Sequence, residues 1–267
     1  SNLENTLRGA AMKDKKTVII TAVNSAWTRE GSVVDLFLES FRSGIETKAL
    51  LNHLVVVCLD RSAYDRCLEI HRHCYALTTA GVDFSGEKPF MSADYLKMMW
   101  RRNEFLIDVL ELGHHFVFSD ADVVWLRNPF PRFFAEDEGD DIQFSCEKCN
   151  YNSTDRRNSP NAGFKYVRSN HKTIEFYRFW FEAHHLFPGE RLQKVLWRIK
   201  FDPIVDRLGL RMRFLDTRYF DGLCEPNSDM DSAVTMHAIC CFGAESKIGA
   251  MKMVIDDWKR YKTKNSS

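Results

Sequence analysis

The most constraining feature of the chain is a series of short apolar segments that alternate with amphipathic ones. Residues 17–23 (TVIITAV) and 53–59 (HLVVVCL) are rich in β-branched and other apolar side chains. Residues 33–42 between them have the period of an amphipathic helix, and a further helix is expected over residues 63–73. Continuous apolar strands that alternate with helices are typical of a parallel sheet covered on both faces. We therefore predict a doubly wound α/β fold, which binds ligands at the carboxyl ends of its strands.

The rest of the chain continues this pattern without an internal repeat or an obvious linker. A long helix is expected over residues 93–112, with Ser92 as its N-cap and Gly113 after its end. We also expect strands over residues 142–145, 162–167, 211–215 and 233–238, and helices over residues 171–187, 191–200 and 250–261. These elements predict one domain over residues 16–262. Residues 1–15 are interpreted as a protease scar (Ser1-Asn2) and a stem remnant, and residues 263–267 as a polar tail.

The charge balance excludes one large class of function. The chain has 37 Lys and Arg against 37 Asp and Glu, so its formal net charge is zero. A nucleic-acid-binding protein would carry a basic surplus.

No apolar run approaches the roughly 18 residues that a membrane helix needs. We expect membrane attachment only through an N-terminal anchor missing from this chain.

Two carboxylates follow an apolar strand at the centre of the sequence. Residues 115–119 lead directly into Asp120 and Asp122. In an extended segment, residues i and i+2 point to the same face, so both carboxylates can bind one hard cation such as Mg²⁺ or Mn²⁺. A turn or helix-capping role is the alternative. The same spacing occurs at Asp229 and Asp231, where it follows a Pro-Asn-Ser turn, and we interpret that pair as loop.

A histidine near the end of the chain is a candidate for a third metal ligand. His237 follows an apolar run at residues 233–236 and is either a metal ligand or a hydrogen-bonded core histidine. Gly243 permits close approach of the backbone to a ligand, and Lys247 supplies a point charge suited to phosphate. The alternative for Lys247 is a surface lysine that opens the last helix.

Three segments together resemble a known family. Residues 116–129, residues 161–169 and residues 236–241 look like the plant nucleotide-diphospho-sugar transferase family. That family groups with retaining arabinosyl- and xylosyltransferases of plant cell-wall glycans and has the GT-A fold, a Rossmann-like, mostly parallel sheet with helices on both faces. The resemblance covers roughly residues 17–262, and its three motifs occur in the expected order.

The resemblance implies a set of site residues. Asp120, Asp122 and His237 match the positions that hold the metal. The positions implied for the nucleotide and donor sugar are Thr21, Ala22, Val23, Asn24, Lys97, Arg101, Asp120, Ala121, Asn161, Gly163, Gly243 and Lys247. For Lys97 and Arg101 the alternative is a solvated helix face with alternating charge.

Two positions depart from the family pattern: Ile239 stands where an asparagine is expected, and the second departure concerns Asp202. Relatives often carry Asp-Gln where this chain has Asp202 followed by Pro203. Asp202 is therefore the only carboxylate at that place. We predict that it aligns the acceptor hydroxyl or stabilises the reacting sugar.

These residues predict a glycosyltransferase that moves a pentose or hexose from a UDP-sugar to a glycan or glycoprotein. It would use Mn²⁺ or Mg²⁺ and retain the anomeric configuration. One alternative is a non-catalytic GT-A-shaped subunit that supports a partner glycosyltransferase. Another is a metal-dependent phosphohydrolase, which would need a water-activating base that no residue clearly offers.

The cysteines and sequons indicate the compartment. The eight cysteines are Cys58, Cys67, Cys74, Cys146, Cys149, Cys224, Cys240 and Cys241. We expect disulfides first, free buried thiols second, and a zinc site at Cys146 and Cys149 last. Sequons at Asn152 and Asn265 also favour a secretory lumen. With the resemblance, they imply the Golgi lumen and a type II membrane protein in the full-length form.

Overall fold

The computed structural model describes residues 2–13, 15–134, 139–150, 152–223 and 229–266. Its strands are β1 (Thr17–Val23), β2 (Leu54–Cys58), β3 (Cys74–Ala76), β4 (His115–Ser119), β5 (Val123–Trp125), β6 (Ile142–Lys148), β7 (Ser159–Val167), β8 (Met212–Phe214), β9 (Phe220–Gly222) and β10 (Thr235–His237). A seven-stranded sheet has the order β3-β2-β1-β4-β7-β6-β8, and a smaller sheet has the order β5-β10-β9. Within the large sheet, β7 is antiparallel to β4 and β6, and the other neighbouring strands are parallel.

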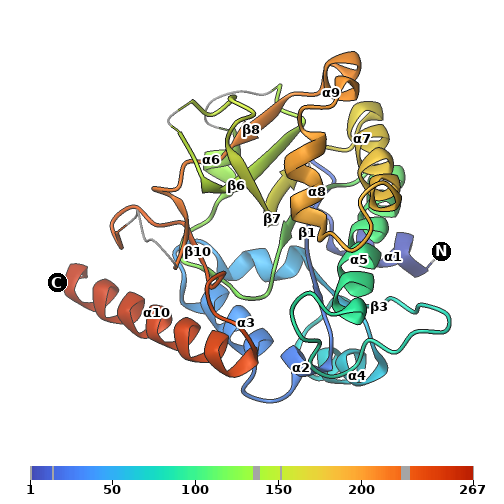
Figure 1. Cartoon of the computed structure of the whole chain (residues 1–267). Coiled ribbons are helices and arrows are strands. Elements are labelled where there is room, and N and C mark those ends of the chain that lie inside the picture. Colours follow the sequence, from blue (N-terminus) through green and yellow to red (C-terminus); the bar gives the residue numbers. More distant parts are fainter. Residues whose placement is uncertain (1, 14, 135–138, 151, 224–228, 267) are drawn as a thin grey trace.

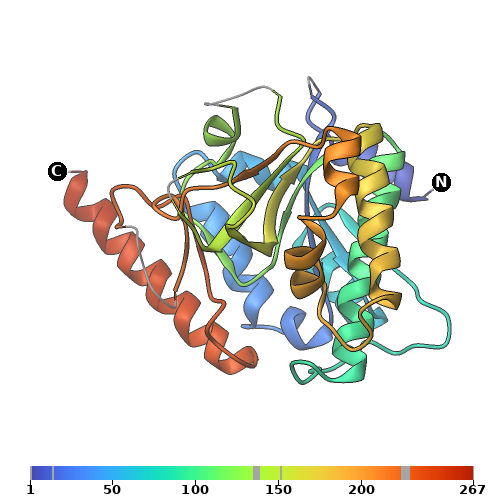
Figure 2. The ribbon, with the colours of Figure 1, turned by 45° about the horizontal axis from the view of Figure 1, so that its top comes forward.

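Helices cover both faces of the large sheet. They are α1 (Asn2–Ala10), α2 (Ser25–Thr28), α3 (Val33–Ser43), α4 (Arg61–Ile70), α5 (Ala93–Glu111), α6 (Phe130–Phe134), α7 (His171–Glu182), α8 (Leu192–Ile199), α9 (Pro203–Leu208) and α10 (Ala244–Asn265), with 3₁₀ turns η1 (Lys48–His53) and η2 (Ala183–His185). Helices α3 and α10 lie on one side of the sheet and α5 and α7 on the other (Figures 1 and 2). This arrangement confirms the predicted α/β architecture.

The apolar sequence of β1 explains why the sheet is buried on both faces. Every residue of this strand is buried. Val18, Ile20 and Ala22 pack into the cluster beneath α5 and α7, whereas Ile19 and Val23 pack into the cluster beneath α3 and α10. Successive side chains of a strand point to opposite faces, so an uninterrupted apolar run supplies both clusters.

The sheet topology brings distant segments to one edge. Strands β1 and β4 are parallel neighbours, so Asn24 and Asp120, which follow them, lie at the same edge. Strand β7 begins at this edge because it is antiparallel to β4, with Phe164 opposite Ser119. Strand β10 is antiparallel to β5, and it places His237 opposite Val123. Chain segments more than 200 residues apart thus meet at the carboxyl end of the parallel strands.

Helices extend past both bounds of the predicted domain. Residues 2–10 form α1, whose Leu3, Leu7 and Ala10 are buried in the core, so this segment packs with the fold. Residues 263–265 extend α10, so they are not a separate polar tail. The terminal Ser1 and Ser267 lie outside the described residues.

Most predicted elements are confirmed within a few residues, and α9 was missed. Its sequence begins with Pro203, which is compatible with the first turn of a helix. None of the described helices has the length and apolar character needed to cross a membrane.

Candidate metal and nucleotide site

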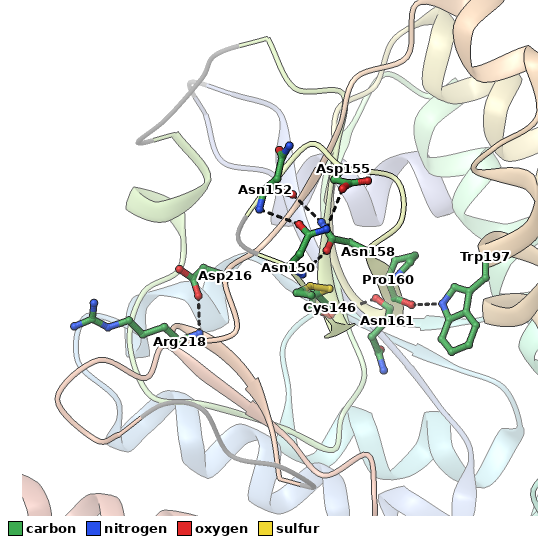
Figure 3. The surroundings of a disulfide bond; sticks show 12 residues. Cys146, Asn150, Asn152, Asp155, Asn158, Pro160, Asn161, Trp197, Asp216 and Arg218 are labelled. Atoms are coloured by element: carbon green, nitrogen blue, oxygen red, sulfur yellow. Dashed lines mark hydrogen bonds between the residues drawn. A yellow bond between two sulfur atoms is a disulfide. The ribbon is translucent and has the colours of Figure 1, made fainter.

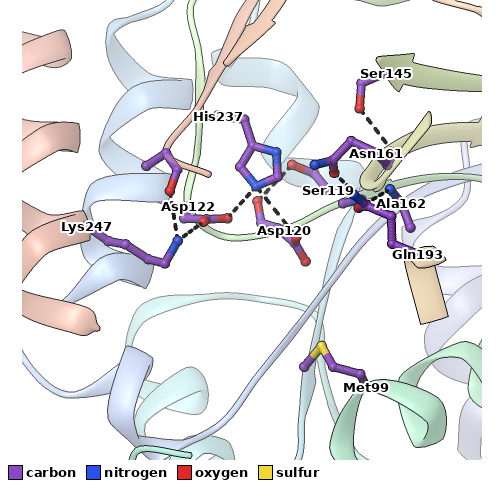
Figure 4. Close-up of polar contacts among 12 residues, drawn as sticks. Met99, Ser119, Asp120, Asp122, Ser145, Asn161, Ala162, Gln193, His237 and Lys247 are labelled. Atoms are coloured by element: carbon purple, nitrogen blue, oxygen red, sulfur yellow. Dashed lines mark hydrogen bonds and ion pairs between the residues drawn. The ribbon is translucent and has the colours of Figure 1, made fainter. Parts of the chain in front are cut away.

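Three side chains from separate elements converge at the edge of the sheet. Asp120 and Asp122 lie between β4 and β5, and His237 is the last residue of β10. The His237 Nε2 atom lies 3.0 Å from Asp122 Oδ1 and 3.6 Å from Asp120 Oδ2. Figure 4 shows the imidazole facing both carboxylates. Asp122 and His237 are buried, with 3% and 8% of their surface exposed.

Each carboxylate also contacts a cation through its other oxygen. Lys247 Nζ donates to Asp122 Oδ2 over 2.6 Å and to the carbonyl of Ala238 over 2.8 Å. Arg102 donates to Asp120 Oδ1. Asp122 Oδ1, Asp120 Oδ2 and His237 Nε2 therefore remain directed at one another.

This arrangement fits a divalent cation. The three groups offer ligand atoms that all lie within 4.8 Å of one another. Adjacent ligands of an octahedral ion with bonds of about 2.1 Å are about 3 Å apart, close to the spacings between His237 and the two carboxylates. Two carboxylate oxygens and an imidazole nitrogen suit Mn²⁺ or Mg²⁺. The residues present could hold such an ion with little rearrangement.

The charges at the site are strongly coupled. Burial acts to raise the pKa of Asp122, but His237 and Lys247 outweigh it and hold this pKa well below its usual range. Burial acts to lower the pKa of His237, but Asp122 and Asp120 outweigh it and raise this pKa. These shifts favour the ionised carboxylate of Asp122, and the His237 Nε2 atom that faces it is the atom that would bind a metal.

Gly163 on β7 is packed directly against this cluster. A Cβ atom built there would clash with Asp120 Oδ2 and would lie 2.7 Å from His237 Cε1 and 2.9 Å from Asn161 Oδ1. The Gly163 carbonyl also accepts a hydrogen bond of 2.7 Å from the Asp120 backbone N–H. Only glycine fits at this position without moving its neighbours.

A second polar group lies beside the cluster. Asn161 Nδ2 and Gln193 Nε2 both donate to Glu147 Oε1, over 2.9 Å and 2.7 Å. The Asn161 and Gln193 side-chain oxygens accept from the backbone N–H groups of Gly163 and Ala162. These bonds fix one carboxylate and two amides next to the predicted metal position.

The cluster of Asp120, Asp122 and His237 and the polar group around Glu147 line one cavity of about 1580 Å³. Several residues predicted to bind the nucleotide and donor sugar also line it: Ala22, Val23, Asn24, Asn161, Gly163, Gly243 and Lys247. The amide of Asn24 already donates to the carbonyls of Phe84 and Gly86, so this side chain holds the neighbouring loop in place. The volume is ample for a nucleotide-sugar-sized ligand.

Four predicted donor-binding residues do not line the cavity. Thr21 and Ala121 are fully buried behind the cavity wall. Lys97 is exposed, and Arg101 donates to Thr79 Oγ1 and Glu104. These positions agree with the alternative of a polar helix face for Lys97 and Arg101, and a role in donor binding stays a prediction for both.

The predicted catalytic role of Asp202 is not supported by its position. Asp202 is the N-cap of α9, where its side chain accepts from the Ile204 backbone N–H over 2.9 Å, and it does not line the cavity. An aspartate directly before a proline is typical of the start of a helix, with Asp202 as N-cap and Pro203 as the first helical residue. A glutamine does reach the cavity, but it is Gln193 on α8.

Sequence reasoning missed Arg102, Glu147 and Gln193. Arg102 lies four residues from both Met98 and Leu106, which are buried, and this spacing could have placed it on the inner face of α5. Gln193 lies three residues before the buried Leu196, so it is a polar residue on an apolar stripe. Nothing in the local sequence distinguishes Glu147 from an ordinary surface carboxylate.

The cysteines are largely paired. Cys67 bonds to Cys74 and Cys146 to Cys149, and Cys240 is also disulfide-bonded. This confirms the expected disulfides and removes the zinc alternative at Cys146 and Cys149. Cys58 and Cys241 are free thiols, and Cys224 lies outside the described residues.

Both predicted glycosylation positions are exposed. Asn152 lies in the loop that follows the Cys146–Cys149 disulfide (Figure 3), and Asn265 ends α10. The second predicted Asp-x-Asp match is confirmed as a turn, in which Asp229 accepts from the backbone of Ser232.

Comparisons with known proteins agree with this geometry. An uncharacterized protein of Arabidopsis thaliana is 48% identical over 256 residues, which cover 96% of this chain and 66% of that protein. The chain thus spans slightly less than two thirds of this relative's length. The Arabidopsis thaliana UDP-D-xylose:L-fucose alpha-1,3-D-xylosyltransferase MGP4 is 25% identical over 43% of this chain and 30% of its own length.

Solved structures show the same fold. A glycosyltransferase involved in the glycosylation of the major capsid of PBCV-1 superposes with a TM-score of 0.52 at 14% identity, covering 88% of this chain and 98% of that one. Together with the mostly parallel sheet, this identifies the architecture as GT-A. The family model for nucleotide-diphospho-sugar transferases matches residues 49–251, which include Asp120, Asp122, His237 and Lys247. The chain belongs to the nucleotide-diphospho-sugar transferase family.

Proposed function

We propose that the protein is a metal-dependent glycosyltransferase that transfers a pentose or hexose from a UDP-sugar to a glycan or glycoprotein. The observation that carries this proposal is the cluster of Asp120, Asp122 and His237, which faces the cavity and is supported by Lys247 and Arg102. The distant similarity to a UDP-xylose-dependent transferase supports the donor class.

The three clustered side chains would hold Mn²⁺ or Mg²⁺. A divalent ion held there would neutralise charge on a diphosphate as a Lewis acid. Lys247 lies beside the cluster and would supply a further positive charge to the leaving diphosphate. The uridine would lie against Ala22, Val23 and Asn24, at the end of β1.

The amide and carboxylate group on the other side would orient the sugars. Asn161, Gln193 and Glu147 hold one another in fixed positions, as a site that aligns hydroxyl groups requires. For a reaction with retention, we propose that the departing diphosphate oxygen accepts the proton of the acceptor hydroxyl. No separate general base is then needed.

We further propose that the full-length protein resides in the Golgi lumen, anchored by a segment that precedes this chain. The disulfides and the exposed Asn152 and Asn265 support an oxidising, glycosylating compartment.

Product analysis with a panel of UDP-sugars, Mn²⁺ and glycan acceptors tests the activity. Transfer of sugar would support the proposal. Release of UDP without transfer would indicate a phosphohydrolase, and binding without turnover would indicate a non-catalytic subunit. Asp122→Asn should abolish the activity, whereas Asp231→Asn, in the exposed second Asp-x-Asp turn, should leave it unchanged.

A further inference from the structure

A deeply buried part of the cavity wall contains a lysine. Lys165 lies on β7, two residues beyond Gly163 and on the same face of the strand. It lines the cavity and has only 2% of its surface exposed. Two residues of strand span about 7 Å between their Cα atoms. Gly163 packs directly against Asp120 and His237, so Lys165 belongs to the same part of the cavity wall as the predicted metal ligands.

The ammonium group of Lys165 has aromatic neighbours and, among the described residues, no carboxylate in ion-pair contact, although Asp120 is near enough to act on its pKa. Its Nζ lies 4.8 Å from the ring centroid of Trp180, 5.2 Å from that of Tyr177 and 5.4 Å from that of Phe118. Within the described part of the chain, no carboxylate lies within 4.0 Å of it. Burial and the nearby Arg102 lower its pKa to about 7. A buried ammonium without a counter-ion is costly to the fold, which suggests a role in binding.

Two further donors on this wall have hydrogen-bonding capacity that no described residue uses. Arg102 packs on the same Phe118 ring, 4.9 Å from its centroid, and its buried Nε atom has no hydrogen-bond partner. Asn103 also lines the cavity, is 2% exposed, and has a buried Nδ2 atom without a partner. Asp120 cannot neutralise both cations, because it already pairs with Arg102 and faces His237.

We propose that Lys165, Arg102 and Asn103 form a subsite for a sugar carboxylate, so that this enzyme acts on a uronic acid. The proposal rests on the function proposed above and specifies its substrate class. Neutral sugar hydroxyls could accept hydrogen bonds from Asn103 and Lys165, but only an anionic group also neutralises the charge of the Lys165 ammonium. The position of Lys165 favours a carboxylate on the donor sugar over one on the acceptor.

Calorimetric titration tests the subsite without relying on turnover. With Mn²⁺ present, UDP-glucuronate or UDP-galacturonate should bind about 10- to 100-fold more tightly than UDP-glucose or UDP-galactose, as expected for one charge-assisted hydrogen bond. Lys165→Met keeps most of the side-chain volume and should remove this preference without weakening UDP. Lys252→Met, a control at an exposed position on α10 that does not line the cavity, should change neither.

A second arm identifies the source of the carboxylate. Protein saturated with UDP and Mn²⁺ is titrated with methyl galacturonide and with methyl galactoside. A preference for the uronide that depends on Lys165 in this arm alone would assign the carboxylate to the acceptor and keep the subsite. The subsite is refuted if UDP binds but neither arm distinguishes charged from neutral sugars, or if Lys165→Met retains the preference. If UDP itself does not bind, the proposed function fails as well.

Discussion

Replacing Gly163 by alanine adds one methyl group at the centre of the proposed site. The backbone of Gly163 is compatible with alanine, because its φ is not in the left-handed region. The added Cβ, however, would clash with Asp120 Oδ2 and lie 2.7 Å from His237 Cε1. The strand cannot retreat, because the Gly163 N–H donates to Asn161 Oδ1 and its carbonyl accepts from Asp120.

The required displacement sets the expected size of the effect. Ordinary contact begins at 3.4 Å, so His237 would have to move by about 0.7 Å and Asp120 by more. Disturbing even the groups that support metal ligands typically costs 10- to 100-fold in metal affinity. We therefore expect Gly163→Ala to weaken Mn²⁺ and UDP binding at least about tenfold. Overpacking should also lower the free energy of unfolding by about 1–3 kcal/mol.

The assay is calorimetric titration with Mn²⁺ and UDP, with Gly249→Ala as the matched control. Gly249 lies in α10, and a Cβ there would meet no atom within 4 Å. The control should bind normally and gain up to about 1 kcal/mol of stability from helix propensity. Binding by Gly163→Ala within about twofold of the unaltered protein would refute the reasoning.

Three further predictions concern the proposed metal ligand His237 and the helix cap Asp202. His237→Ala should weaken Mn²⁺ and UDP binding together in calorimetry, whereas loss of UDP binding alone would contradict a ligand role. The carboxylates raise the pKa of His237, and a metal can bind this imidazole only in its neutral form. The increase in melting temperature caused by Mn²⁺ should therefore grow as the pH rises from about 6 to 8. In the metal-free protein, the ion pair of His237 with the carboxylates should contribute less to the free energy of unfolding as the pH rises over this range. An increase in melting temperature with Mn²⁺ that does not depend on pH would argue against this ion pair. Asp202→Ala should cost about 1 kcal/mol in chemical denaturation through loss of the α9 N-cap and leave UDP affinity unchanged, and a large loss of affinity would restore Asp202 to the site.

Some parts of the site could be predicted because their signals are local. The apolar run of β4 ends directly before Asp120 and Asp122, and alternation along an extended chain places both carboxylates on one side. His237 was predicted as a ligand mainly through the family resemblance, since a single histidine after an apolar run has no specific signature. The sheet of parallel strands followed from β1 and β2, whose side chains are apolar on both faces.

The errors arise where small offsets or distant contacts decide the outcome. Successive residues of a helix point about 100° apart. Arg101 was predicted to face the donor site, but it is the next residue, Arg102, whose side chain lines the cavity. Asp202 was selected by position in a motif, but Pro203 makes it a helix cap. Glu147 and Gln193 meet only after β6 and α8 pack against β7, and no spacing in the sequence reports that contact.

The protein region before β1 shows a similar limit. Residues 2–10 are largely polar, and their Leu3 and Leu7 are too few to indicate burial by composition. The structure shows that the helix is held by the sheet against which those residues pack. Tertiary packing, rather than local propensity, decides whether such a short helix forms.

The central claim is that Asp120, Asp122 and His237 bind the nucleotide through a divalent ion. Calorimetric titration of UDP in the presence of Mn²⁺, repeated after addition of EDTA, tests it most directly. The two carboxylates alone would repel a diphosphate, so we predict that UDP binds with Mn²⁺ and at least about tenfold more weakly with EDTA. Equal affinity under the two conditions would contradict the claim.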